Sequence, residues 1–312
     1  MGKLKQITDK ISKKNKAVLC ILSAAFFFAL MNLFVSLSGD VPTVQKTFFR
    51  NFFALIIAST ALIKNKCSVI PPKGARGELF MRGAFGYLGV LCNFYAISHL
   101  NISDASLLNK MSPFFAMIFS MIILKERANG FQWAMILTAF AGALFVIKPT
   151  FQNADLVASA AGFAGGMFAG LAYTFVRKAT SKGVKGYYVV FFFSAFSTLA
   201  ALPLTIAQFS PMTAAQLLSL VGAGLSAAGG QFSITAAYTF APAKEVSIYD
   251  YSQIGFAAIL GFIFMRQVPD GWSFLGYGII FAAALAMFIY NNRPHDKKTG
   301  HGDNKVTPED SA

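Results

Sequence analysis

The sequence is poor in charged residues, histidine and cysteine for its length. Only 13% of its 312 residues are charged, whereas 55% are hydrophobic. Soluble domains carry about a quarter charged residues, so this composition favours a chain that folds in a bilayer. The three cysteines, Cys20, Cys67 and Cys92, lack metal-ligand spacing. We therefore expect free thiols rather than a disulfide framework.

The sequence also lacks the short motifs of several enzyme classes. It contains no phosphate-binding GxxxxGK[ST] loop, no HExxH and no GxSxG, and two of its three histidines lie close to the C-terminus. The first absence argues against an ATP-driven pump built from this chain alone. The others leave a hydrolase or metalloenzyme few groups to use. We therefore predict no catalytic residues, no metal site and no cofactor.

Positive charge is abundant but is not arranged for nucleic acid. The net charge is +14, and the basic residues form short clusters between long apolar runs. Such clusters are typical of membrane topology signals and of attraction to anionic lipid. Membrane lipid is therefore an expected partner, and nucleic acid is not.

Ten apolar runs approach the length of about 20 residues that a spanning helix needs. They predict an all-α membrane protein with ten transmembrane helices, preceded by a basic tail at residues 1–16 and followed by a polar, disordered tail at residues 291–312. The runs are Ala17–Leu37, Val44–Ile63, Leu79–Ser98, Ala105–Leu124, Gly130–Ile147, Leu156–Val176, Gly186–Ala207, Leu217–Tyr238, Val246–Met265 and Gly271–Tyr290.

The basic residues between these runs alternate in a way that predicts orientation. Twenty-two of the 27 fall on one side, among them Arg82, whereas only Lys148 and Arg266 fall on the other and three lie inside helices. Lys and Arg accumulate on the cytoplasmic side of a membrane. We therefore expect a multi-pass protein of the cell (inner) membrane with both termini in the cytoplasm.

The two halves of the chain resemble each other weakly. A shift of 141 residues aligns residues 96–144 with residues 237–285 without a gap, and it pairs polar positions such as Lys125 with Arg266 and Asn129 with Asp270. This predicts two five-helix repeats, at residues 17–148 and 156–290. Because five is odd, the second copy enters the membrane inverted, which is typical of secondary carriers.

One stretch of the first half resembles a known family. Asp104-Ala105-Ser106, Pro113, Leu124-Lys125-Glu126-Arg127 and Gly130 are similar to the end of the first repeat in EamA-type transporters of the drug/metabolite transporter superfamily. The resemblance covers essentially the whole chain and implies a ten-helix carrier. The second half departs from the pattern, since Gln267 replaces the glutamate and Ile254 replaces the proline.

Few polar residues lie deep in the predicted helices, so each requires a reason. In the fourth helix Ser106, Asn109, Lys110 and Pro113 share one face, and the 141-residue shift relates three of these positions to Ser247, Asp250 and Tyr251 in the ninth helix. We predict that both faces line a central substrate cavity, with Pro113 as a hinge and Asp250 as the candidate proton-coupling group. The alternative is that Lys110 snorkels to the outer interface while Asp250 lies near the inner one.

Arg50 of the second helix is the remaining candidate, since its planar guanidinium suits a carboxylate or phosphate. The alternative for Arg50 is a structural ion pair within the bundle. With Arg50 and Lys110 placed towards the outside and Asp250 towards the inside, the predicted substrate is an amino-acid-like zwitterion or a small organic anion.

The sequence therefore predicts a secondary-active transporter of a small molecule that works by alternating access, with a coupling proton or a counter-substrate as a further partner. A glycine stripe at Gly162, Gly166 and Gly170 predicts close packing of the sixth helix, and we expect a monomer or a weak homodimer. The alternatives are a multidrug or cation exporter of the same superfamily, an intramembrane enzyme and a channel.

Overall fold

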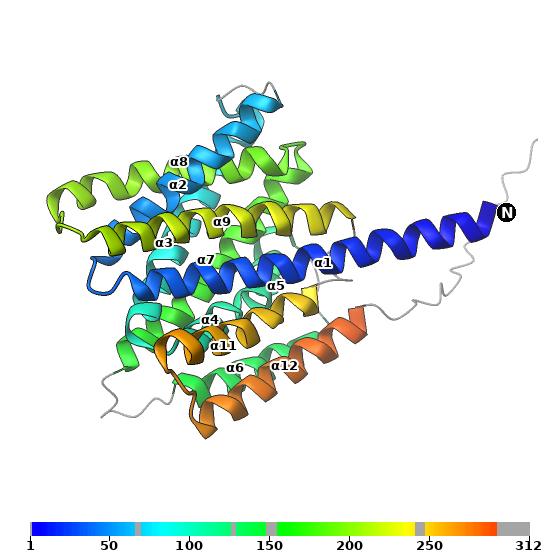
Figure 1. Cartoon of the computed structure of the whole chain (residues 1–312). Coiled ribbons are helices and arrows are strands. Elements are labelled where there is room, and N and C mark those ends of the chain that lie inside the picture. The colour runs from blue at the N-terminus through cyan, green and yellow to red at the C-terminus, as the bar shows by residue number, and fades with distance from the viewer. Residues whose placement is uncertain (1, 66–69, 126–128, 148–154, 241–246, 292–312) are drawn as a thin grey trace, which may run out of the picture.

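A computed structural model describes residues 2–65, 70–125, 129–147, 155–240 and 247–291, all of them in helices or short connections (Figure 1). The expectation of an all-α protein is confirmed, since these residues contain no strand. The helices are α1 (Gly2–Leu37), α2 (Thr43–Lys64), η1 (Lys73–Ala75), α3 (Arg76–His99), α4 (Ile102–Asn109), α5 (Ser112–Ile123), α6 (Gly130–Ile147), α7 (Leu156–Ser181), α8 (Gly186–Ala207), α9 (Ala214–Phe240), η2 (Ser247–Tyr251), α11 (Ser252–Met265) and α12 (Gly271–Asn291).

Each of the ten predicted spans has its counterpart in this series. Seven segments of the described chain are long and apolar enough to cross a membrane, and α6 is a shorter apolar helix. One boundary differs from expectation. Helix α1 begins at Gly2 and so continues through the basic tail, whereas the predicted tail at residues 291–312 lies, apart from Asn291, outside the described residues.

The bundle has apolar side chains on its surface and polar side chains in its interior. Ile63, Leu199 and Leu218 are among the large apolar residues that are about two-thirds exposed or more, while Lys46, Arg50 and Asn51 are buried. This distribution is opposite to that of a soluble protein and fits a lipid-facing surface.

The predicted fourth helix is divided into α4 and α5 at Lys110 and Met111. Pro113 has no N–H with which to bond the carbonyl of Asn109, and the N–H of Phe114 bonds Met111 rather than Lys110. The carbonyl of Lys110 instead accepts a hydrogen bond from the Tyr251 hydroxyl at 3.2 Å. The break therefore replaces helical hydrogen bonds with a contact to η2.

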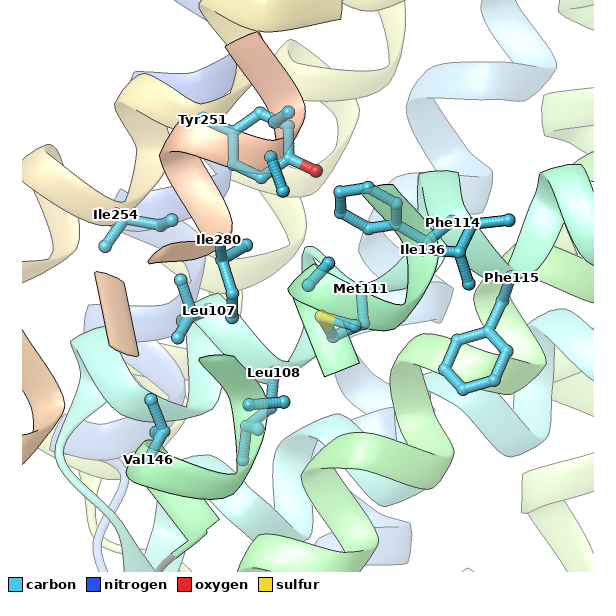
Figure 2. Packing of buried hydrophobic residues seen from close by; sticks show 14 residues of the cluster. Leu107, Leu108, Met111, Phe114, Phe115, Ile136, Val146, Tyr251, Ile254 and Ile280 are labelled. Carbon is cyan, nitrogen blue, oxygen red and sulfur yellow. The ribbon is translucent and has the colours of Figure 1, made fainter. Parts of the chain in front are cut away.

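The two sides of this break share one apolar cluster. Leu107, Leu108 and Met111 pack with Tyr251 and with Ile254 of α11 (Figure 2). Helix α7 also approaches the break, where a Cβ atom on Gly166 would lie 2.5 Å from the Leu108 carbonyl oxygen. The glycine stripe of α7 therefore allows backbone contact between α7 and the broken helix.

The packing of helices is repeated when the two halves are exchanged. Helix α1 packs on α9, and the equivalent pair after the exchange is α7 with α3. Helix α2 also packs on α9, and the equivalent pair is α8 with α3. The pairs α2 with α8 and α6 with α12 map onto themselves. Figure 1 shows α6 and α12 side by side along one edge of the bundle.

Candidate functional site

A cavity of about 100 Å³ lies where α1, α2, α3, α4, α7, α8, α9, η2 and α11 meet. Apolar and polar side chains line it together. The polar and charged residues of the lining are Asn32, Arg50, Arg82, Asn93, Asn109, Lys110, Gln231, Asp250 and Gln253. The cavity is smaller than the roughly 300–1,000 Å³ of a typical small-molecule site.

Lys110 and Asp250 form a direct ion pair at the wall of this cavity. The Lys110 Nζ lies 2.5 Å from the Asp250 Oδ2, and the two side chains are 9% and 16% exposed. Lys110 is thus buried rather than snorkelling to an interface. The expectation that Lys110 and Asp250 mark opposite ends of the cavity is wrong, because their side chains touch. The break in the fourth span positions both side chains, since Lys110 is the C-cap residue of α4 and Asp250 lies in η2.

Arg50 and Arg82 face the same aromatic ring. The guanidinium carbons lie 5.9 and 4.1 Å from the centre of the Phe193 ring. Arg50 also donates a hydrogen bond from Nη1 to Asn51 Oδ1 at 2.6 Å. Neither arginine has an ion-pair partner within the described part of the chain. The alternative of a structural ion pair for Arg50 is therefore unsupported here.

The cost of burying these two cations decides how to interpret them. Moving an ion out of water costs on the order of several kcal/mol. A cation–π contact contributes only about 0.5–2 kcal/mol. The ring of Phe193 therefore does not offset the burial of both guanidinium groups, and an anionic ligand would.

Several polar atoms around the cavity lack a hydrogen-bond partner within the described residues. They include two donors, Nε of Arg50 and of Arg82, and three acceptors, namely Oδ1 of Asn32, Asn93 and Asp250. Buried polar groups are nearly always satisfied, so five such atoms around one cavity make it the candidate binding site.

The other predicted residues lie beside the cavity or outside the described side chains. Ser106 is fully buried and accepts a hydrogen bond from Asn32 Nδ2 at 3.0 Å. Tyr251 is buried and holds the Lys110 carbonyl. Pro113 lies at the break, and the side chain of Ser247 is not described.

Sequence reasoning missed several residues of this lining. Arg82 was assigned to the cytoplasmic face because it lies near the start of its helix, yet it is only 7% exposed. Asn32 and Asn93 carried a usable signal, because each is an isolated polar residue within an apolar run. Phe193 carried none, since 34 phenylalanines are spread over the chain.

A second cavity, of about 590 Å³, opens at one end of the bundle. Its lining includes Asp40, Asp104, Asp155 and Asp270. On α1 the central cavity reaches Asn32 and the second cavity begins at Ser36. We call this second cavity the acidic vestibule.

Comparisons with known proteins agree on one family. The profile of the EamA-like transporter family matches residues 15–148. The pseudopaline exporter CntI of Pseudomonas aeruginosa is 32% identical over 272 residues, which cover 86% of this chain and 95% of the exporter. Solute carrier family 35 member G1 of Homo sapiens is 28% identical over 284 residues, covering 86% of this chain and 77% of the carrier.

A solved crystal structure has the same fold. It is 16% identical, covers 90% of this chain and 99% of its own, and superposes with a TM-score of 0.65. The relatives are named for transport and not for catalysis. From sequence and structure together, the chain belongs to the EamA-like transporter family and is a multi-pass membrane transporter rather than an enzyme.

Proposed function

We propose that this transporter moves a small organic anion or an amino-acid-like zwitterion across the membrane by alternating access. The observation that carries the proposal is the central cavity, where Arg50, Arg82 and the Lys110–Asp250 pair meet. Charged groups inside a membrane bundle are costly and mark substrate or ion pathways. A multidrug or cation exporter is the second candidate, but the excess of positive charge in the lining disfavours a cationic substrate.

Alternating access requires two halves that exchange conformations, and several details support an inverted repeat at residues 17–148 and 156–290. Lys125 and Arg266, which are 141 residues apart, both have positive φ, at 56° and 53°. Asn129 Oδ1 accepts a hydrogen bond from the N–H of Gln132, and Asp270 Oδ1 accepts one from the N–H of Ser273. These two helix caps are also related by 141 residues.

Contacts between connections support the proposed topology. Lys182 donates a hydrogen bond to Glu78 at 2.7 Å, which joins the η1–α3 and α7–α8 connections. Gln267 Oε1 accepts one from the N–H of Ile102 at 3.0 Å, which joins the α3–α4 and α11–α12 connections. Both contacts fit the proposed arrangement, in which the first pair of connections faces the cytoplasm, the second pair faces the outside, and both termini are on the cytoplasmic side of the inner membrane.

The second contact also accounts for the missing glutamate of the second repeat. Gln267 caps the first turn of α4, a role that needs only a neutral acceptor.

We further propose that the transporter works as a monomer or weak homodimer, with a proton at Asp250 or a counter-substrate as the coupled species.

Counterflow in liposomes tests the proposal. Purified protein is reconstituted, loaded with unlabelled compound and supplied outside with the labelled form of succinate, 4-aminobutanoate or 1,4-diaminobutane. We expect saturable uptake, stimulated by internal substrate, of the anion or the zwitterion and not of the diamine. Uptake of the diamine alone would favour the cation exporter, and uptake that does not saturate would favour a channel.

A further inference from the structure

We propose that Arg50 and Arg82 act together as a site for a substrate with two negative charges, such as a small dicarboxylate or a phosphate. The inference rests on the transport function proposed above and makes the substrate class narrower. In this proposal Arg82 binds the substrate together with Arg50.

Charge balance is the first support. Four charged side chains line the cavity, and Lys110 and Asp250 neutralise each other in direct contact. The uncompensated charge of the lining is therefore the two guanidinium groups, which are only 3% and 7% exposed. A ligand with one carboxylate would leave one of them without a counter-charge in a medium of low dielectric constant.

Geometry is the second support. Arg50 from α2 and Arg82 from α3 both line the central cavity and both lie near the ring of Phe193, so a single small ligand in the cavity can contact both. Gly86 makes room for this arrangement, because a Cβ atom there would collide with Arg82 Nη1 and with the Phe193 ring. The Arg82 side chain thus lies along its own helix towards the cavity.

Hydrogen-bonding capacity is the third support. The Nε atoms of both arginines are buried and have no partner within the described residues. A guanidinium binds a carboxylate or phosphate through two parallel N–H donors, and Nε is one of the donors available for such a pair. Two unpartnered Nε donors in the lining of one cavity suit two carboxylates, or one phosphate shared between them.

Binding measurements on the purified full-length protein test this inference. Isothermal titration at constant ionic strength and pH 8 compares succinate and inorganic phosphate with three four-carbon relatives of succinate: succinamate, 4-aminobutanoate and 1,4-diaminobutane. We expect one dianion to bind at least ~10-fold tighter than succinamate, as one additional charged hydrogen-bonded pair predicts. Comparison of succinate with phosphate then separates a dicarboxylate from a phosphate substrate.

Variants then assign the effect to the arginines. We expect Arg82→Gln and Arg50→Gln each to weaken binding of the dianion by ~10-fold or more and to remove its advantage over succinamate. Arg82→Lys retains charge but not the fork, so an intermediate loss is expected. Arg76→Gln is the matched control, since Arg76 lies on the same helix with its Nε on the Pro71 carbonyl, outside the cavity.

The outcomes separate the inference from the transport function. If neither dianion binds, or if succinamate or 4-aminobutanoate binds as tightly as both dianions, the inference is wrong. In that case, uptake of succinate or 4-aminobutanoate in the counterflow assay would still support the proposed transport function. Preferential binding of 1,4-diaminobutane would overturn both. If a glutamine variant fails to fold, the preference of the unaltered protein for a dianion over succinamate decides the matter.

Discussion

Single residues show how a bilayer-spanning bundle retains charge in its interior. Lys110 and Asp250 come from different halves of the chain, yet their charged atoms lie 2.5 Å apart. Each makes burial of the other tolerable, because an isolated buried charge is far more costly than a paired one. Asp250 keeps Oδ1 without a partner in the described structure, so the pair still offers one acceptor to the cavity.

The first prediction is that Lys110 and Asp250 are strongly coupled in stability. Lys110→Met or Asp250→Asn alone removes one partner of a buried ion pair, and we expect each to cost about 3–5 kcal/mol. The double variant has no unpaired charge, so its loss is expected to be smaller than the sum of the two. Unfolding in one detergent, followed as a double-mutant cycle, measures the difference. Additive losses would show that the pair is not coupled.

At the scale of helices, bilayer thickness explains why the ten spans could be predicted. A spanning segment must satisfy its backbone internally, so long apolar runs become helices almost without exception. Pro113 likewise predicted a hinge in the fourth span, because proline removes a helical hydrogen bond, and the structure breaks the helix just before it. The hinge itself stays a prediction, since one conformation shows no movement.

Other features depend on contacts between distant segments and had no local signal. The 3₁₀ turn η2 at Ser247–Tyr251 occurs although Ile254 replaces the expected proline. The hydroxyl of Tyr251, the last residue of η2, donates a hydrogen bond to the carbonyl of Lys110, 141 residues away. The depth of Arg82 was also invisible, because Arg82 lies only a few residues into a helix whose end faces the cytoplasm in the predicted topology. Its guanidinium packs against the ring of Phe193 of α8, a residue more than 100 positions away in the chain.

A second prediction concerns the contact of α7 with the broken helix. Gly166→Ala places a methyl group 2.5 Å from the Leu108 carbonyl oxygen, and we expect a destabilisation of about 1–3 kcal/mol from overpacking. The control is Gly255→Ala in α11, where a Cβ atom would meet nothing within 4 Å. Thermal unfolding of both variants in the same detergent measures the effect. Equal unfolding temperatures of the two variants would show that α7 can move away from the Leu108 carbonyl without a measurable loss of stability.

The topology of the whole molecule gives a third prediction. Thr213, at the α8–α9 connection, and Pro72 and Ser181, at the α2–α3 and α7–α8 connections, are exposed. In a background without Cys20, Cys67 and Cys92, we expect a membrane-impermeant maleimide to label Thr213→Cys in intact cells. Labelling of Pro72→Cys and Ser181→Cys should require broken cells. The reverse pattern would invert the proposed orientation.

A short barrier separates the central cavity from the acidic vestibule at one end of the bundle. Asn32 of α1 and Ser106 of α4 are joined by a buried hydrogen bond of 3.0 Å. Around them Met31, Val35 and Ile97 belong to one apolar cluster. On α4 the vestibule reaches Asp104 and the central cavity begins at Asn109, so about one helical turn separates the two spaces. In the proposed alternating-access cycle, a substrate that passes through the vestibule requires this short barrier to open.

The last prediction is that linking α1 to α4 across this barrier stops transport. In the cysteine-free background, Asn32→Cys combined with Ser106→Cys is treated with a short bifunctional thiosulfonate. We expect counterflow of the transported four-carbon probe to fall to the level of empty liposomes and to recover when a reductant cleaves the link. Each single variant, treated in the same way, controls for the loss of the Asn32–Ser106 hydrogen bond and for blocking of the cavity by the reagent. Because α1 and α4 must separate if the substrate leaves through the vestibule, undiminished flux in fully linked protein would place the exit path elsewhere in the bundle.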